Sequence, residues 1–329
     1  KAKEDRASAA DKDLSGPPQV YPSEIDPRYH QSAWIADRMI DLIEESTPDQ
    51  PFFALCSFVD PHHPFDPPAP YSTMYDPDKL ALPVRQEGEL DDKPPHFRRH
   101  RVGQGCSNEK YDYRRLTDHQ WGEVKAAYYG MVSLVDYNIG RILQALRDKG
   151  ITNDTLVLFT NDHGELMGDH GLLFKGPFHY DCLIKAPMIL SWPGVIPSGS
   201  RYKQITEHVD IMPTLLDFAG VRAPNGVQGM SMAPILRGDG GAGREYALTE
   251  FTCYDWGLNV KTITGRHYKL TYYAGEAYGE LYDRDRDPNE FVNLWEHPEY
   301  QEIKQTLLRK LLDRVIETED TLPLRIGKY

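Results

Sequence analysis

Helical periodicity alternates along this chain with short apolar runs, and this alternation is the feature that most constrains its fold. Apolar residues recur at helical spacing over residues 32–45 and 118–149, which predicts two amphipathic helices. Three short apolar runs, residues 52–59, 155–160 and 188–192, have the composition of buried strands. Helices that alternate with strands predict an α/β sheet flanked by helices, in which we expect 52–59 to be a buried parallel strand.

The period changes beyond the glycine-rich run 238–243. Before this run we expect one more helix, and after it an antiparallel hairpin that turns at Gly265–Arg266. The expected elements are a helix over 211–219, strands over 246–249, 258–264 and 268–273, and a last helix over 298–317. We therefore predict that residues 1–240 are part of the α/β domain. Residues 241–329 are predicted to form a small α+β subdomain with an antiparallel sheet and one helix.

Charge and cysteine usage exclude several kinds of partner. The formal net charge is −13, so neither nucleic acid nor an anionic membrane surface is an expected partner. No run approaches the ~20 apolar residues of a membrane helix, and residues 1–15 lack the apolar core of a signal peptide. The cysteines lie far apart, which indicates isolated thiols: Cys56, Cys106, Cys182 and Cys253. Periplasmic, secreted and cytoplasmic locations all stay open, as does a homo-oligomer.

The segment Asn161–Glu165 directly follows an apolar run and reads Asn-Asp-His-Gly-Glu. In open α/β sheets, ligand sites lie beyond the carboxyl ends of the strands. Asp162 and His163 would place a carboxylate and an imidazole side by side there, as two ligands of one metal ion. The alternative is a turn in which Asp162 caps the following backbone.

The long proline-rich stretch 60–118 shows no clear periodicity, and a loop of this length inside a domain is usually functional. His62 and His63 stand between prolines in it, where a histidine can bind an anion or transfer a proton. A solvent-facing loop is the alternative for these histidines. The basic run 98–101 is expected to be a solvated turn, with selection of the substrate as its other possible role.

Lys175, 13 positions after Asp162, is either a surface lysine or a cation for a bound anion.

Taken together and in this order, these segments resemble the sulfatase family. Residues 51–68 look like the family's strand and its following P-H-x-P loop. Residues 159–171 closely resemble its metal segment, and Lys175 falls at the family's lysine. Further matching stretches are 187–194, 208–216, 280–283 and 287–290, so the resemblance spans residues 30–318.

The resemblance implies an alkaline-phosphatase-like fold, with a mixed sheet flanked by helices, and hydrolysis of a small sulfate ester. Asp162 and His163 would be ligands of one divalent metal, calcium in the first place and manganese in the second. His62 would bind the sulfate and help to protonate the leaving oxygen, and Lys175 would hold another sulfate oxygen. His63 occupies a variable position and receives no role.

The chain departs from the family in its nucleophile, a formylglycine made from the cysteine of C-x-[P/A]-x-R. None of the four cysteines has this context, and the paired aspartates of the family's first strand are also absent. We therefore expect a C-terminal portion that lacks the N-terminal third of the family domain. Its missing segment would be its partner, and the portion alone would be inactive.

Two other functions stay open on the sequence. Relatives of sulfatases cleave phosphonate esters and phosphate mono- or diesters with the same set of ligands, so such a hydrolase is the enzyme alternative. A non-catalytic pseudoenzyme, acting as an ester-binding or glycan-binding module, is the alternative from another class. Upstream coding sequence that contains C-x-[P/A]-x-R would favour the sulfatase, and a degenerate motif would favour the binding module.

Overall fold

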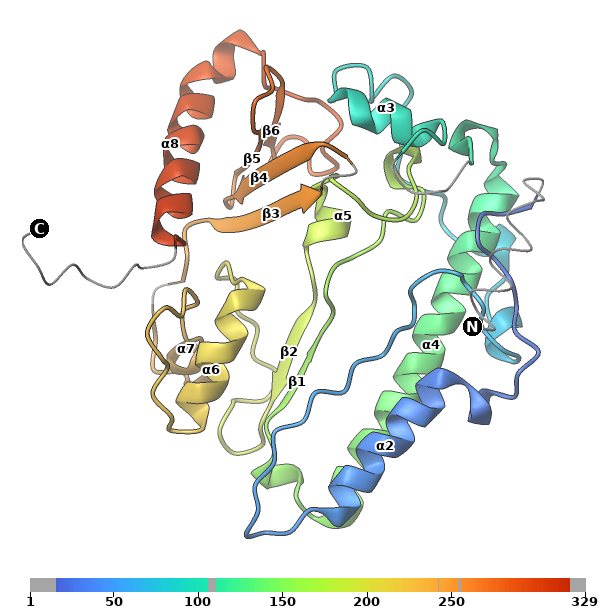
Figure 1. The fold of residues 1–329 in the computed structure, drawn as a ribbon, viewed down its shortest axis with the longest axis vertical. Coiled ribbons are helices and arrows are strands. Elements are labelled where there is room, and N and C mark those ends of the chain that lie inside the picture. The colour runs from blue at the N-terminus through green and yellow to red at the C-terminus, as the bar shows by residue number, and fades with distance from the viewer. Residues whose placement is uncertain (1–15, 106–110, 242, 254–255, 320–329) are drawn as a thin grey trace, which may run out of the picture.

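The computed structural model describes residues 16–105, 111–241, 243–253 and 256–319 (Figure 1). The expectation for residues 1–15 therefore lies outside the described residues, and the division of the chain at residue 240 stays a prediction. No helix in these ranges combines the length and the apolar character needed to cross a membrane.

Two long helices, α2 (Gln31–Glu45) and α4 (Asp118–Lys149), confirm the predicted helices and pack against each other. The sequence encodes both ends of α4. At its start, the hydroxyl of Thr117 accepts the N–H of Gln120, and the Gln120 side chain accepts the N–H of Thr117. At its end, Gly150 has a φ of 78°, the left-handed conformation that commonly terminates helices.

The predicted strands at 155–160 and 188–192 are confirmed as β1 (Val157–Thr160) and β2 (Met188–Ser191), which pair antiparallel. The prediction of a buried parallel strand at 52–59 is wrong. This segment runs extended between β1 and α4 in Figure 1, but it pairs with no strand among the described residues. Phe53 is 80% and Leu55 82% exposed. Apolar composition predicts burial only where another layer covers the segment, and no described residue covers these side chains.

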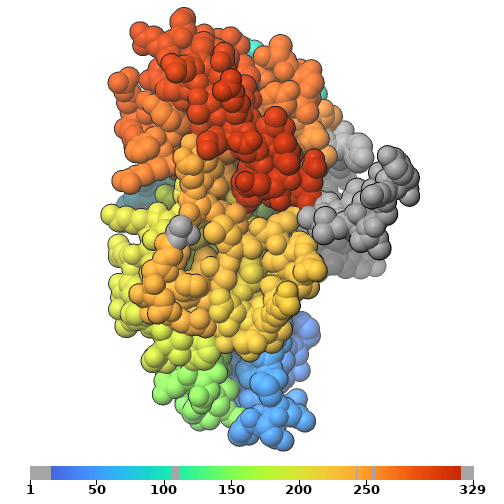
Figure 2. Space-filling view, turned by 90° about the vertical axis from the view of Figure 1, so that its left-hand side faces the viewer, coloured from blue at the N-terminus to red at the C-terminus, as the bar shows by residue number. Residues whose placement is uncertain are grey.

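The C-terminal part is a four-stranded antiparallel sheet in sequential order. Its strands are β3 (Ala247–Cys253), β4 (Leu258–Thr264), β5 (Tyr268–Tyr273) and β6 (Gly279–Asp283). The last helix, α8 (Gln301–Glu317), packs on this sheet as expected, and Figure 2 shows their orange and red atoms together at one end of the molecule. The first three strands and α8 were predicted. β6 was not, because residues 280–283 were matched to the family without an expected secondary structure.

The stretch 60–118 is not one continuous loop, because α3 (Pro95–Arg101) lies within it. The basic run is therefore the end of a helix and not a solvated turn. Arg98 and Arg99 are exposed, but His100 is buried against the rest of the protein. The other α-helices are α5 (Asp181–Ile184), α6 (Ile211–Phe218), which confirms a predicted helix, and α7 (Ala233–Arg237). Single 3-10 turns occur at Pro27–Tyr29, Tyr71–Thr73, Pro77–Lys79, Tyr113–Arg115, Thr152–Asp154, Asp169–Gly171, His208–Asp210 and Pro298–Tyr300.

Two of the hydrophobic clusters meet at the segment that carries Lys175. The first packs α4 against the loops around it and contains Phe65, Trp121, Met131 and Phe174. The second contains Phe97 of α3, Phe178 and Tyr282 of β6. Phe174 and Phe178 flank Lys175 in sequence, so the backbone around this lysine is anchored in a separate cluster on each side.

Candidate active site

Asp162 and His163 lie just after the end of β1, and their side chains lie close together. The imidazole Nε2 of His163 is 3.5 Å from Oδ2 of Asp162. The other ring nitrogen, Nδ1, lies 2.7 Å from the carbonyl oxygen of Gly164 and donates its hydrogen to it. With the hydrogen on Nδ1 used in this bond, Nε2 of the neutral ring carries the lone pair that can ligate an ion.

Two atoms with lone pairs at this separation fit the coordination sphere of one ion. Metal–ligand bonds of ~2.0–2.4 Å place neighbouring ligand atoms roughly 3–3.6 Å apart. The Asp162 side chain is 85% exposed and that of His163 is 36% exposed, so an ion has access to both. The second oxygen of Asp162 accepts the N–H of His163 at 2.9 Å, which orients the carboxylate. This bond reaches only the next residue and is therefore not the capping turn considered as the alternative, so the role of the pair as metal ligands stays a prediction.

His62 lies on an exposed loop after Asp60. Its Nδ1 is 2.6 Å from the carbonyl oxygen of His63, and its backbone N–H donates to Val59 at 3.1 Å. With Nδ1–H engaged in this bond, Nε2 is the nitrogen that can take up or release a proton. The rings of His62 and His63 stack with their centroids 4.2 Å apart. The loop therefore holds the exposed imidazole of His62 against a partly buried one.

Lys175 lies on a loop that contacts the histidine loop. Phe174, its neighbour, has a φ of 66°, which is uncommon for a residue other than glycine. The ring of Phe174 lies 4.4 Å from that of His63 and 6.1 Å from that of Phe65, centroid to centroid. Lys175 itself is half-buried. The structure therefore brings together the loops of His62 and Lys175, which are more than 100 positions apart in the sequence.

Tyr128 of α4 connects these loops with the Asp162 segment. Its ring lies 5.9 Å from the ring of Phe65. Burial, with smaller contributions from the negative charges of Glu165 and Asp162, raises the pKa of Tyr128 to about 12. No motif or spacing in the sequence points to this tyrosine. Convergence of His62, Lys175, Asp162 and His163 on one cleft stays a prediction, because neither of two surface hollows outlined by the described residues is lined by any of the four.

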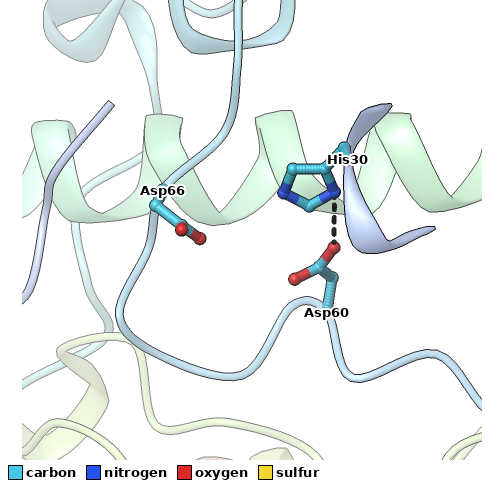
Figure 3. Close-up of side chains that lie close together, drawn as sticks. All are labelled: His30, Asp60 and Asp66. Atoms are coloured by element: carbon cyan, nitrogen blue, oxygen red, sulfur yellow. Dashed lines mark ion pairs between the residues drawn. The ribbon is translucent and has the colours of Figure 1, made fainter. Parts of the chain in front are cut away.

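A second polar cluster contains residues on both sides of His62 in the chain (Figure 3). His30, Asp60 and Asp66 are all buried, and one ligand-type atom from each comes within 4.8 Å of the others. Within the described ranges, this is where three such groups come together. Nδ1 of His30 lies 3.4 Å from Asp60 and accepts the N–H of Ser32 at the start of α2.

Further hydrogen bonds show what this cluster does in the fold. Asp60 accepts the hydroxyl of Ser32, and it accepts the side-chain amide of Gln31 at 2.8 Å. Because Ser32 and Gln31 belong to α2, the cluster ties the start of that helix to the residue from which the His62 loop departs. This cluster has no local sequence pattern, since His30 lies 30 positions or more from Asp60 and Asp66.

The cysteines that the structure describes do not have the environment of a nucleophile. Cys56 and Cys182 are free thiols and partly buried. Burial raises the pKa of both, to about 12 for Cys182, whereas a reactive thiol needs a lowered pKa. Cys106 lies outside the described residues, and so does the side chain of Cys253. For the two that are described, the prediction of isolated thiols agrees with the structure.

Comparison with known families gives two matches that together cover most of the chain. The family model described as Sulfatase matches residues 6–221. The model described as N-sulphoglucosamine sulphohydrolase, C-terminal, matches residues 168–317. The first match includes all four predicted site residues, His62, Asp162, His163 and Lys175.

Individual relatives and solved structures agree with these matches. An arylsulfatase of Clostridium perfringens is 32% identical over 292 residues, which cover 88% of this chain and 58% of that protein. A phosphonate monoester hydrolase from Silicibacter pomeroyi superposes with a TM-score of 0.80 at 28% identity, covering 91% of this chain and 62% of the other. The phosphonate monoester hydrolase of Agrobacterium radiobacter gives 0.80 at 29% identity, with coverages of 93% and 64%. The chain thus spans less than two thirds of these proteins, and the superpositions confirm the predicted alkaline-phosphatase-like fold class.

Proposed function

Because the chain belongs to the sulfatase family, we propose that it carries part of the active site of a sulfuric ester hydrolase that uses one divalent metal. The observation that carries this proposal is the 3.5 Å separation of His163 Nε2 and Asp162 Oδ2, two atoms that can each ligate an ion. These two residues would hold the ion, calcium or manganese. When bound, the ion would withdraw charge from the ester oxygens and activate the attacking oxygen.

His62 and Lys175 are proposed to act on the substrate. Cleavage of a sulfate ester leaves negative charge on the sulfate oxygens and on the departing alcohol oxygen. The ammonium of Lys175 would stabilise the charge on a sulfate oxygen. His62 would donate a proton from Nε2 to the leaving oxygen, since its Nδ1–H is already bonded to the carbonyl oxygen of His63.

The nucleophile is proposed to lie outside these 329 residues. None of the four cysteines stands in C-x-[P/A]-x-R, and burial raises the pKa of Cys56 and Cys182. The exposed apolar segment 52–59 supports a further proposal, that additional polypeptide covers Phe53 and Leu55 in the complete enzyme. We propose that the same polypeptide supplies the formylglycine and the remaining metal ligands.

Hydrolysis of a phosphonate or phosphate ester is the second candidate. It is favoured by the two phosphonate monoester hydrolases that superpose with a TM-score of 0.80. Both reactions place anionic oxygens and a leaving alkoxide at the same positions, so His62 and Lys175 would keep their roles. Only the preference for sulfur or phosphorus would differ.

The test is an assay of the complete enzyme on 4-nitrophenyl sulfate and on 4-nitrophenyl phenylphosphonate, with calcium or manganese. We expect turnover of at least one ester that stops when the ion is chelated. His62→Ala should lower kcat by roughly 10²–10⁴-fold. His119→Ala, which removes an exposed histidine on α4, should leave kcat unchanged. Metal-independent activity, or equal activity of the two variants, would refute the proposed site.

A further inference from the structure

Two histidines of α3 bracket Lys175 by bonding to the backbone on either side of it. Nε2 of His100 lies 2.8 Å from the carbonyl oxygen of Leu173, two residues before the lysine. Nε2 of His96 lies 3.1 Å from the carbonyl oxygen of Pro177, two residues after it. His96 and His100 are four positions apart on one helix, so their side chains project from the same face of α3.

Both histidines are donors in these bonds. They are buried, with exposed fractions of 4% and 3%. Nδ1 of His96 is buried and has no hydrogen-bond partner among the described residues, so it carries no hydrogen and Nε2 carries the one hydrogen of the neutral ring. Burial lowers the pKa of His96 to about 4 and also lowers that of His100, so both rings stay neutral at physiological pH.

The two imidazoles are themselves fixed by packing. The ring of Phe178 lies 5.5 Å from that of His96 and 4.9 Å from that of His100, centroid to centroid. Trp256 lies about equally close to both, at 6.1 Å and 5.9 Å. Because the two rings are held in this way, their Nε2–H groups fix the carbonyl groups of Pro177 and Leu173. The segment between these two carbonyl groups carries the half-buried Lys175.

We propose that His96 and His100 are positioning residues that set the place of the Lys175 ammonium for the bound ester. This inference rests on the proposed function of Lys175. The imidazoles do not act on the substrate: their Nε2–H groups are used on Leu173 and Pro177, and they are buried. They hold the backbone of Lys175 in place, and so restrict where its flexible side chain can put the ammonium. Misplacement of a catalytic group by ~1 Å can lower the rate roughly 100-fold.

The substitutions separate loss of the donor from loss of the ring. His100→Phe keeps the ring and removes the donor. His100→Gln keeps a donor, because the amide nitrogen of glutamine is as many bonds from Cα as Nε2 of histidine. In the complete enzyme, assayed on 4-nitrophenyl sulfate and 4-nitrophenyl phenylphosphonate, we expect His100→Phe to lower kcat by roughly 10–100-fold with little change in KM. His100→Gln should recover most of that loss, and exposed His267→Phe should have no effect.

A double-mutant cycle with Lys175→Ala decides whether the histidine acts through the lysine. If it does, His100→Phe has no further effect once Lys175 is gone. Hydrogen exchange of the peptide 172–178 should also accelerate in His100→Phe and return in His100→Gln. Multiplying effects of the two substitutions, with loss of activity in Lys175→Ala, would overturn the positioning role and leave the proposed function intact. Full activity of Lys175→Ala would instead overturn the role of the lysine and the positioning role with it.

Discussion

The ring of His63 contacts that of Phe174, with the centroids 4.4 Å apart, and so joins the loop of His62 to the loop of Lys175. Each of these aromatic residues stands next to a proposed functional residue. His63 also stacks on His62, and Phe174 belongs to the cluster that packs against α4. The contact between His63 and Phe174 thus helps to set the relative placement of the proposed proton donor, His62, and the proposed cation, Lys175.

Lys175→Ala should lower kcat of the complete enzyme by about 10²–10³-fold without unfolding it, because one cation aimed at the transition-state charge is lost. KM should change less than kcat, since the charge that the lysine meets is greatest in the transition state. Lys185→Ala removes an exposed lysine ten positions further on and is the matched control. Steady-state kinetics on both esters measure the effect. Equal kinetics of the two variants would identify Lys175 as an ordinary surface residue.

Asp162→Ala should weaken binding of a divalent ion by the complete enzyme by more than the roughly 10–100-fold typical of losing an outer-shell partner. The reason is that the substitution removes a ligand and also the acceptor that orients the N–H of His163. Isothermal titration with calcium and with manganese gives the affinity. Asp154→Ala, a change of an exposed carboxylate just before β1, should leave it unaltered. An unchanged affinity in Asp162→Ala would place the metal site elsewhere.

Local patterns predicted much of the fold because the relevant interactions are local. The capping residue Thr117 and the terminating Gly150 both lie within one turn of α4. The prediction of a buried strand at 52–59 was wrong for a different reason. Apolar composition indicates that a segment tends to be buried, but it does not indicate which other segment covers it. The contacts of His96 and His100 were beyond prediction, because their partners Pro177 and Leu173 lie 81 and 73 positions away.

The buried histidines predict how stability depends on pH. The pKa of His96 is lowered to about 4 and that of His179 to about 3, both chiefly by burial. Between these values and the ordinary 6.5, the unfolded chain binds protons that the folded chain does not, so stability falls as the pH drops below 6.5. His96 alone should cost about 2 kcal/mol between pH 7 and pH 5.

Urea unfolding of the wild type and of His96→Gln at pH 7 and pH 5 checks this dependence. Glutamine cannot titrate, so the variant should lose less stability between the two pH values than the wild type. The comparison cancels the contribution of the carboxylates, which is common to both proteins. The same pH dependence in both would show that His96 titrates near its ordinary value in the folded state.

Lys269→Met should destabilise the C-terminal sheet severely. The Lys269 side chain is fully buried, pairs with Asp181 at 3.1 Å and also contacts Glu290. Removal of the Lys269 ammonium leaves the carboxylates of Asp181 and Glu290 without this cation. Loss of one partner of a buried ion pair lowers the free energy of unfolding by about 3–5 kcal/mol. Lys261→Met on β4 is the control, because its pair with Glu250 is partly exposed and worth about 1 kcal/mol or less. Similar unfolding free energies in the two variants would contradict a structural role of the buried pair.

The last prediction concerns the 329 residues by themselves. A hard cation such as calcium takes ~6–8 oxygen ligands, most of them carboxylates. At the proposed metal site the described residues contribute Asp162 and His163, and no cysteine of the chain stands in the context that yields formylglycine. We therefore expect these residues alone to bind calcium weakly and to release no nitrophenol from 4-nitrophenyl sulfate. Calorimetric titration and a spectrophotometric assay measure the two quantities, with the complete enzyme as the positive control. Tight binding together with turnover would place the nucleophile and the remaining ligands within these residues, and would contradict the proposal that they lie outside.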